Sequence, residues 1–252
     1  MQPAERIKQK LAAGELVTGV LATNHVWPGL IELCQSADVD YLIVDQEHGP
    51  YHDGISAEIC RLGRLADFAT LIRTISTDYD VVRRAMDMGP CGLMFPCVDG
   101  TQALDEARDA IWMPPRGRRR PGGLGNAWVS NIQLSAWQEQ VEGSLLVLPQ
   151  VESKSGLANA VDIANHEIVT SLAIGPYDLS GSLGCLGNLD HPDFASALAQ
   201  LRSAASQAGK PMWMIGDGQR WVQEGFHFIC FCEPTQLLGK SLAASVKQMK
   251  QL

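Results

Sequence analysis

Several polar side chains directly follow short apolar runs, so the ends of buried strands would bring them together. Gln150 and Glu152 stand two residues apart, and Asp178 follows a later run. Residues two apart on a strand point to the same face. A carboxylate there is costly unless it is paired or binds a metal, and carboxylate oxygens suit Mg²⁺ or Mn²⁺ better than Zn²⁺. Glu152 and Asp178 are therefore candidate metal ligands; the alternative is a buried ion pair between Glu152 and Arg73.

A cationic and an imidazole side chain also follow apolar runs. Arg73 ends one run, and its planar guanidinium suits two-bond binding of a carboxylate. His48 lies just after another run that ends at Asp45. Imidazole has an ordinary pKa of about 6.5, which suits a general base at neutral pH. Taken alone, His48 fits a solvent-exposed loop residue equally well.

These residues belong to an alternation of apolar and helical segments. The eight apolar runs are residues 19–23, 41–45, 70–74, 92–96, 144–152, 168–176, 211–216 and 226–231. The segments of helical period are residues 29–37, 54–66, 78–88, 101–111, 155–165, 193–208, 217–224 and 235–250. This alternation predicts an α/β fold, a (β/α)8 TIM barrel, with a doubly wound open sheet as the alternative. We expect a single domain over residues 1–252, because no linker divides the chain.

Two polar segments interrupt the alternation, at residues 114–143 and 177–192. Loops this long are usually functional. The first contains the basic run Arg116–Arg120, which we interpret as a solvated loop or a subunit contact, because no aromatic residues interleave with it. Gly122–Gly125 lacks the strand–turn–helix setting of a nucleotide site, so no nucleotide is expected.

Composition narrows the class of protein. The 252 residues are 46% hydrophobic with a formal net charge of -8, which fits a globular core and argues against disorder and against general nucleic-acid binding. No apolar stretch is long enough to cross a membrane, and the polar start is not a signal peptide. The seven cysteines are expected to be reduced, buried thiols in a cytoplasmic protein.

The order and spacing of five motifs resemble the HpcH/HpaI aldolase family over nearly the whole chain. The motifs are V-D-Q-E-H (44–48), L-I-R (71–73), Asp87-Met88-Gly89, P-Q-V-E (149–152) and G-P-Y-D-L-S (175–180). The resemblance implies a phosphoenolpyruvate/pyruvate-type barrel and a metal-dependent, class II pyruvate aldolase of the 4-hydroxy-2-oxoheptane-1,7-dioate aldolase type. It also implies trimers or hexamers, usually with an exchanged C-terminal helix.

The resemblance further assigns roles to residues. It implies that Glu152 and Asp178 hold Mg²⁺, Mn²⁺ or Co²⁺, that His48 is the base, and that Arg73 stabilises developing charge. The residues implied to contact substrate are Arg73, Gln150, Gly175, Pro176, Tyr177 and Asp178. Asp87 would raise the basicity of His48, while Asp45 and Glu47 would surround the site. The partners implied are a 2-oxo acid and an aldehyde, with no nucleic acid or membrane.

Two geometric arguments accompany these roles. Asp87 ends the helix after the third strand, so it lies far from its own site, and we expect it to reach His48 of a neighbouring subunit. Lys210 precedes a strand and belongs at the wrong end of a barrel, and Lys154 is a second choice, so Schiff-base catalysis is disfavoured.

Three functions remain open. The first is cleavage of a 4-hydroxy-2-oxo acid to pyruvate and an aldehyde, or the reverse addition. The second uses the same site for oxaloacetate decarboxylation or addition to an unusual acceptor, because Tyr177 and Arg120 depart from the family pattern. The third is a non-catalytic barrel that binds a carboxylate ligand.

Overall fold

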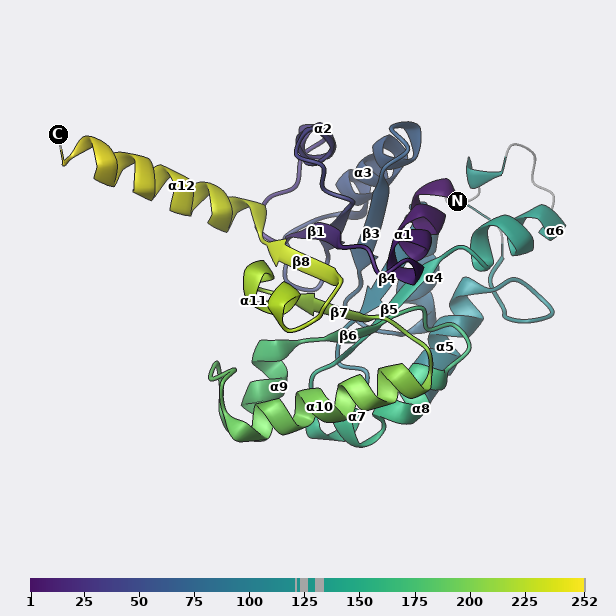
Figure 1. Cartoon of the computed structure of the whole chain (residues 1–252). Coiled ribbons are helices and arrows are strands. Elements are labelled where there is room, and N and C mark those ends of the chain that lie inside the picture. Colours follow the sequence, from purple (N-terminus) through teal and green to yellow (C-terminus); the bar gives the residue numbers. More distant parts are fainter. Residues whose placement is uncertain (121, 123–126, 130–133, 252) are drawn as a thin grey trace.

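Eight parallel strands close into a barrel in sequence order, as Figure 1 shows for a computed structural model that describes residues 1–120, 122, 127–129 and 134–251. The strands are β1 (Val17–Ala22), β2 (Tyr41–Asp45), β3 (Ala69–Arg73), β4 (Gly92–Phe95), β5 (Leu146–Val151), β6 (Leu172–Ile174), β7 (Met212–Ile215) and β8 (Phe228–Cys232). The predicted (β/α)8 barrel is confirmed, and the open sheet is wrong because β1 pairs with β8.

Helices surround the barrel and occupy most of the predicted segments (Figure 1). They are α1 (Gln2–Ala12), α2 (Gly29–Ser36), α3 (Asp53–Leu65), α4 (Tyr79–Asp87), α5 (Thr101–Ile111), α6 (Leu134–Trp137), a π-helix (Gln138–Glu142), α7 (Lys154–Ala158), α8 (Ala160–Asn165), α9 (Pro176–Leu183), α10 (Pro192–Gln207), α11 (Gly218–Gln223) and α12 (Pro234–Met249). The predicted helix at 155–165 is thus two short helices.

Helix α9 begins at Pro176 and extends into the segment 177–192, which the sequence pattern presents as a polar interruption. Pro176 stands in its first turn, where a missing N–H costs nothing, and Gly184 ends it in a left-handed conformation with φ of 90°. The helix therefore begins at once after β6. Asp178 consequently lies in the first turn of a helix.

Alternate residues of the strands fill the barrel interior with large, fully buried side chains. The Tyr41 ring takes the space beside Gly19, where an added Cβ would lie 2.1 Å from its Cζ. Trp213 Nε1 donates to Tyr41 Oη at 2.8 Å, and the Phe228 ring meets Tyr41 edge-on at 5.1 Å between centroids. These three rings form a floor that separates the two ends of the barrel.

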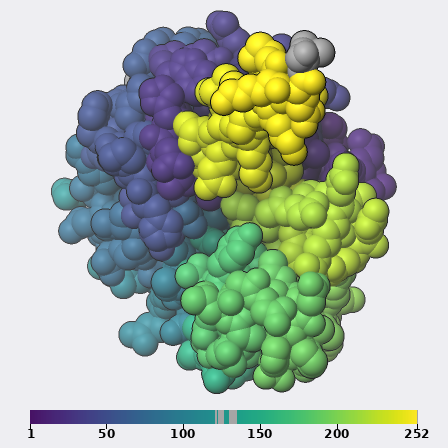
Figure 2. Space-filling model, turned by 90° about the vertical axis from the view of Figure 1, so that its left-hand side faces the viewer, coloured from purple at the N-terminus to yellow at the C-terminus, as the bar shows by residue number. Residues whose placement is uncertain are grey.

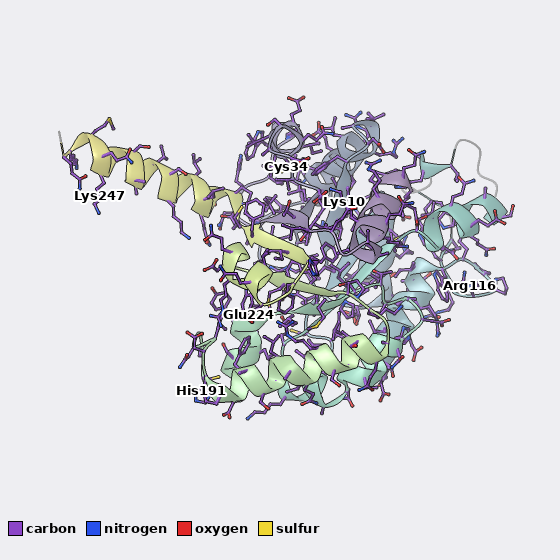
Figure 3. All side chains as sticks on the ribbon, in the orientation of Figure 1. Lys10, Cys34, Arg116, His191, Glu224 and Lys247 are labelled. Carbon is purple, nitrogen blue, oxygen red and sulfur yellow. The ribbon has the colours of Figure 1, made fainter. Side chains whose placement is uncertain are left out.

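The insert 114–143 connects α5 to β5, and its residue Arg116 lies at the end of the molecule opposite Lys247 of α12, as Figure 3 shows. Its basic run is not simply solvated. Arg119 is fully buried with its guanidinium over the Trp137 ring, while Arg116 and Arg118 stack on Trp112 and Tyr79. Because two of these rings come from distant segments, interleaving in the sequence could not reveal them. Of the glycine-rich stretch, residues 123–125 lie outside the described part.

Helix α12 projects away from the barrel and buries none of its residues (Figures 1 and 2). Its exposed apolar side chains are Leu237, Leu238, Leu242, Val246 and Met249. Among the described residues, no helix combines the length and apolar character needed to cross a bilayer.

Candidate active site

Three polar side chains continue the inward face of the barrel toward the carboxyl ends of the strands. Asp45, Arg73 and Gln150 each follow, by two residues, a buried side chain of the barrel interior, namely Ile43, Leu71 and Leu148. Strand alternation therefore turns them inward as well. All three are buried. They form a polar layer above the apolar interior, at the end where barrel enzymes carry their chemistry.

Arg73 and Asp45 form a two-bond ion pair inside this layer. Arg73 Nε and Nη2 donate to Asp45 Oδ1 at 2.8 Å and Oδ2 at 2.6 Å. Register explains the choice of partner, since the two residues lie directly opposite on β3 and β2. The alternative pair between Arg73 and Glu152 is wrong: no such ion pair forms in the described chain. Burial alone would raise the pKa of Asp45, but its bonds to Arg73 outweigh burial and lower it.

Asp45 also holds the turn that carries His48. Its carboxylate accepts hydrogen bonds from Thr23 Oγ1 at 2.7 Å and from the backbone N–H groups of Glu47 and His48 at 3.1 and 3.3 Å. The carboxylate is therefore occupied by five donors of the protein. This arrangement makes Asp45 an organiser of Arg73 and of the following turn.

The outer edge of the Arg73 guanidinium faces the opening. Its Nη1 lies 3.1 Å from Glu47 Oε2 and 3.5 Å from Gln150 Oε1. Burial raises the pKa of Glu47 although Arg73 opposes that shift. Because Asp45 takes the Nε and Nη2 side, a substrate carboxylate or oxyanion would have to meet Arg73 along the Nη1 edge, which it would share with Glu47 and Gln150.

Glu152 lies buried beyond the end of β5 in a close-fitting cradle. The backbone N–H of Cys97 donates to its Oε1 at 2.6 Å. Gly175 leaves room for the other oxygen, since an added Cβ would stand 2.1 Å from Oε2. Burial raises the pKa of Glu152, and the negative charge of nearby Asp178 raises it further. Two carboxylates thus repel each other here, one buried and one exposed to solvent.

This donor set fits a divalent cation. Burial and the charges of Glu152, Glu47 and Asp178 together raise the pKa of the Cys97 thiol to about 12, so three acids act on one small volume. Arg73 is the cation beside them, and Asp45 already neutralises it. Within the described residues, no group of three His, Cys, Asp or Glu side chains could hold a metal ion. Glu152 and Asp178 would offer an ion two carboxylates, and its other oxygens would have to come from water and substrate.

Cys97 is a residue of this site that reasoning from the sequence missed. It is exposed, not buried as expected for the cysteines, and its φ of 52° is left-handed. That conformation, rare outside glycine, turns its N–H toward Glu152. The sequence did offer one indication. Cys97 comes two residues after β4, and barrel enzymes gather their site residues at the carboxyl ends of strands.

His48 and Asp87 are not brought together within one chain. The His48 side chain is 61% exposed, and its Nε2 lies 3.7 Å from Glu47 Oε2. Asp87 accepts instead from Arg119 Nη2 at 2.8 Å and from Arg83 Nη1 at 3.3 Å.

Tyr177 is 56% exposed in the first turn of α9, beside Asp178.

Comparison with known proteins agrees with this geometry. The model of the HpcH/HpaI aldolase/citrate lyase family matches residues 22–231. The chain belongs to this family. This membership confirms the resemblance and makes the chain an enzyme of the aldolase type.

Relatives resemble it over nearly their whole length. A hydroxypyruvate/pyruvate aldolase of Pseudomonas aeruginosa is 30% identical, covering 95% of this chain and 91% of the relative. A 5-keto-4-deoxy-D-glucarate aldolase of Escherichia coli O139:H28 is 29% identical, covering 89% and 88%. The crystal structure of an HpcH/HpaI aldolase from Desulfitobacterium hafniense superposes with a TM-score of 0.90 at 25% identity, covering 98% and 97%.

Proposed function

We propose that this aldolase cleaves a 4-hydroxy-2-oxo acid to pyruvate and an aldehyde, or catalyses the reverse addition, with a divalent cation at Glu152 and Asp178. The observation that carries the proposal is the excess of carboxylates around Glu152 beside the outer edge of Arg73. Relatives named for hydroxypyruvate, pyruvate and a keto-deoxy sugar acid support an oxo-acid substrate.

Each side chain has a distinct task in this reaction. Gln150 and the Nη1 edge of Arg73 bind and orient the 2-oxo acid, and the buried position of both excludes water from that end. The backbone of Gly175 and the side chains of Pro176 and Tyr177 border the same substrate. His48 accepts the proton of the 4-hydroxyl group as the C3–C4 bond breaks. The electron pair of that bond passes into the 2-oxo acid as its enolate, and protonation at C3 gives pyruvate.

Charge develops on the 2-oxo oxygen during this step. Arg73 places a fixed positive charge next to it, held at a set angle by Asp45. When bound, Mg²⁺, Mn²⁺ or Co²⁺ would supply Lewis-acid stabilisation of the same charge, worth several kcal/mol. Lys210 is assigned no role, because it stands at the opposite end of the barrel, before β7.

The experiment is an assay of pyruvate release after removal of metal. Stripping divalent ions with EDTA should abolish cleavage of a 4-hydroxy-2-oxo acid, and adding back Mg²⁺, Mn²⁺ or Co²⁺ should restore it. Glu152→Gln and Asp178→Asn should each lose Mn²⁺ binding and activity, while Glu15→Gln, an exposed carboxylate before β1, should change neither. Full activity after stripping, or inactivation by borohydride in the presence of pyruvate, would overturn the proposal.

Tyr177 favours testing a second reaction alongside the first. Its large exposed ring borders the opening, where it would limit the size of the acceptor. Oxaloacetate decarboxylation needs no acceptor aldehyde, so oxaloacetate belongs in the same assay panel. Faster pyruvate release from oxaloacetate than from every hydroxy-oxo acid would identify decarboxylation as the main activity. A folded enzyme that binds pyruvate but turns over none of the panel would support the carboxylate-binding barrel.

A homo-oligomer completes the proposal. The exposed apolar side chains of α12 suit burial against another subunit, and a trimer or hexamer would allow Asp87 of one subunit to approach His48 of another.

A further inference from the structure

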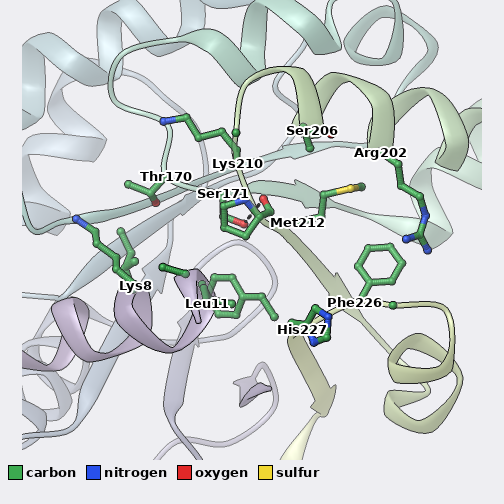
Figure 4. A pocket seen from close by; sticks show the side chains of 17 residues that line it. Lys8, Leu11, Thr170, Ser171, Arg202, Ser206, Lys210, Met212, Phe226 and His227 are labelled. Carbon is green, nitrogen blue, oxygen red and sulfur yellow. Dashed lines mark hydrogen bonds between the residues drawn. The ribbon is translucent and has the colours of Figure 1, made fainter. Parts of the chain in front are cut away.

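A second cavity opens at the barrel end opposite the candidate active site. It has a volume of about 800 Å³ and is bordered by the ends of α1 and α10 and by the first residues of β5, β7 and β8, as Figure 4 shows. Its volume falls within the usual range for small-molecule sites, about 300–1,000 Å³. Nothing in the proposed aldol reaction uses it.

The floor of the barrel isolates this cavity from the active site. Phe228 lines the cavity and packs against Tyr41, which in turn bonds to Trp213. All three side chains are fully buried. A substrate bound at Glu152 therefore cannot reach the cavity through the barrel, and any ligand of the cavity is a separate molecule.

The charged groups that line the cavity are basic, in a chain whose net charge is -8. Lys8, Lys210 and Arg202 line it together with His227, and its described lining residues include no aspartate or glutamate, although Glu224 Oε2 lies 3.7 Å from Arg202 Nη2. Figure 4 shows Lys8 and Lys210 toward the edge near Thr170, and Arg202 against the Phe226 ring at the opposite edge. Desolvation by burial lowers the pKa of Lys8, Glu5 opposes this shift, and the charge of Lys210 adds to the lowering. The two ammonium groups therefore repel each other across this edge.

The two lysines differ in what already binds them. Lys8 Nζ donates to the carbonyl of Gly143 at 2.8 Å and lies 3.5 Å from Glu5. The side chain of Lys210 makes no hydrogen bond or ion pair with any described residue, although the residue is half-buried. A negative group placed between the two ammonium groups would favour the charged form of both.

The remaining walls are apolar. Leu11, Leu146, Met212, Phe226 and Phe228 contribute hydrocarbon surface between the cationic edges. An inorganic ion would leave this surface unused, whereas a ligand with a hydrocarbon body would bury it. The basic edge and the apolar walls of the cavity are therefore complementary to an amphipathic anion.

We propose that this cavity binds a small organic anion with an apolar body, its carboxylate or phosphate between Lys8 and Lys210 and its hydrocarbon part against Phe226 and Phe228. Because α1 and α10 end nearby and helix carboxyl ends attract cations, a structural role for the lysines is the rival explanation. That role predicts a change in stability with no ligand attached.

Titration calorimetry on the full chain tests the proposal with octanoate, hexyl phosphate and neutral 1-octanol. Octanoate or hexyl phosphate should bind once per chain, and the tighter of the two identifies carboxylate or phosphate as the preferred group. Lys210→Met should weaken that binding by about tenfold, as loss of one charge-assisted hydrogen bond predicts. Lys210→Arg should retain it, and Lys247→Met on α12 should match the wild type.

Thermal melting and competition with oxalate separate the possible outcomes. Thermal melting checks that Lys210→Met is folded, and Lys8→Met provides a second variant if it is not. Saturating oxalate with Mg²⁺, directed at the active site, should leave octanoate binding unchanged. Equal binding of 1-octanol and octanoate, unchanged binding in folded Lys210→Met or Lys8→Met, or displacement by oxalate would each overturn the proposal.

Discussion

The carboxylate of Asp45 grips the guanidinium of Arg73 by two hydrogen bonds, at 2.8 and 2.6 Å, across neighbouring strands. The pair fixes which edge of Arg73 remains open to substrate. The same carboxylate holds the backbone of Glu47 and His48. One buried residue that touches no substrate therefore sets the orientation of two residues proposed to do so.

Asp45→Asn should lower the free energy of unfolding by about 3 kcal/mol at pH 7, because it removes the two-bond carboxylate partner of a buried guanidinium. The folded-state pKa of Asp45 is lowered, so the stabilisation is fully present above the unfolded value of about 3.9. It disappears as pH falls through the lowered folded value. Urea unfolding of both proteins from pH 7 to pH 3 measures the difference.

The matched control is Asp190→Asn, whose side chain is 84% exposed beside Arg220. Exposed pairs contribute about 0–1 kcal/mol, so this variant should remain close to the wild type at every pH. An Asp45→Asn protein as stable as the control would contradict the role of the pair.

Substitutions at Cys97 should act through its backbone. Glycine accepts a left-handed conformation, so Cys97→Gly should keep the N–H bond to Glu152 and bind Mn²⁺ as the wild type does. Valine resists that conformation by about 1–2 kcal/mol, so Cys97→Val should shift the N–H and weaken Mn²⁺ binding by about tenfold or more. Electron paramagnetic resonance of free Mn²⁺ gives both affinities. Equal Mn²⁺ affinities in the wild type and both variants would show that the N–H bond from residue 97 to Glu152 does not affect metal binding.

Asp87→Asn tests whether this carboxylate assists His48 of another subunit. An aspartate next to an imidazole favours its protonated form, so its loss should move the acidic limb of the kcat/KM profile to lower pH. Arg83→Met removes a neighbouring partner of Asp87 and should leave the limb in place. A profile that is identical in Asp87→Asn would restrict Asp87 to its observed bonds with Arg119 and Arg83.

Replacing Leu238 and Leu242 together by glutamate should dissociate the oligomer. Both leucines lie on the apolar stripe of α12, and each buried leucine contributes roughly 1.5–3 kcal/mol. Sedimentation analysis should show a smaller species than the wild type. Lys240→Glu, on another face of α12, is the control. A wild-type chain that sediments as a monomer would contradict the proposed assembly.

The fold was largely predictable because the barrel depends on local patterns. Continuous apolar runs marked most strands, and helical periodicity marked most helices between them. The strand-end rule then placed Asp45, Arg73 and Gln150 at the same mouth. Helix α9 escaped prediction because glycine and serine are common in loops, whereas here Pro176 starts a helix directly after β6.

The partners of individual side chains were less predictable because they depend on distant residues. Arg73 binds Asp45 through the register of β2 and β3, which composition does not specify. Arg119 is buried by Trp137, well beyond it in the chain. The backbone at Cys97 is left-handed, a conformation that cysteine usually avoids, so the residue type gives no sign of it.

The floor of Tyr41, Trp213 and Phe228 also constrains traffic through the enzyme. A barrel filled at this depth leaves the candidate active site open only at the carboxyl ends of the strands. In the proposed reaction, both products would leave from that face. The aldehyde would be the fragment farther from Gln150 and Arg73, so we expect it to leave before pyruvate.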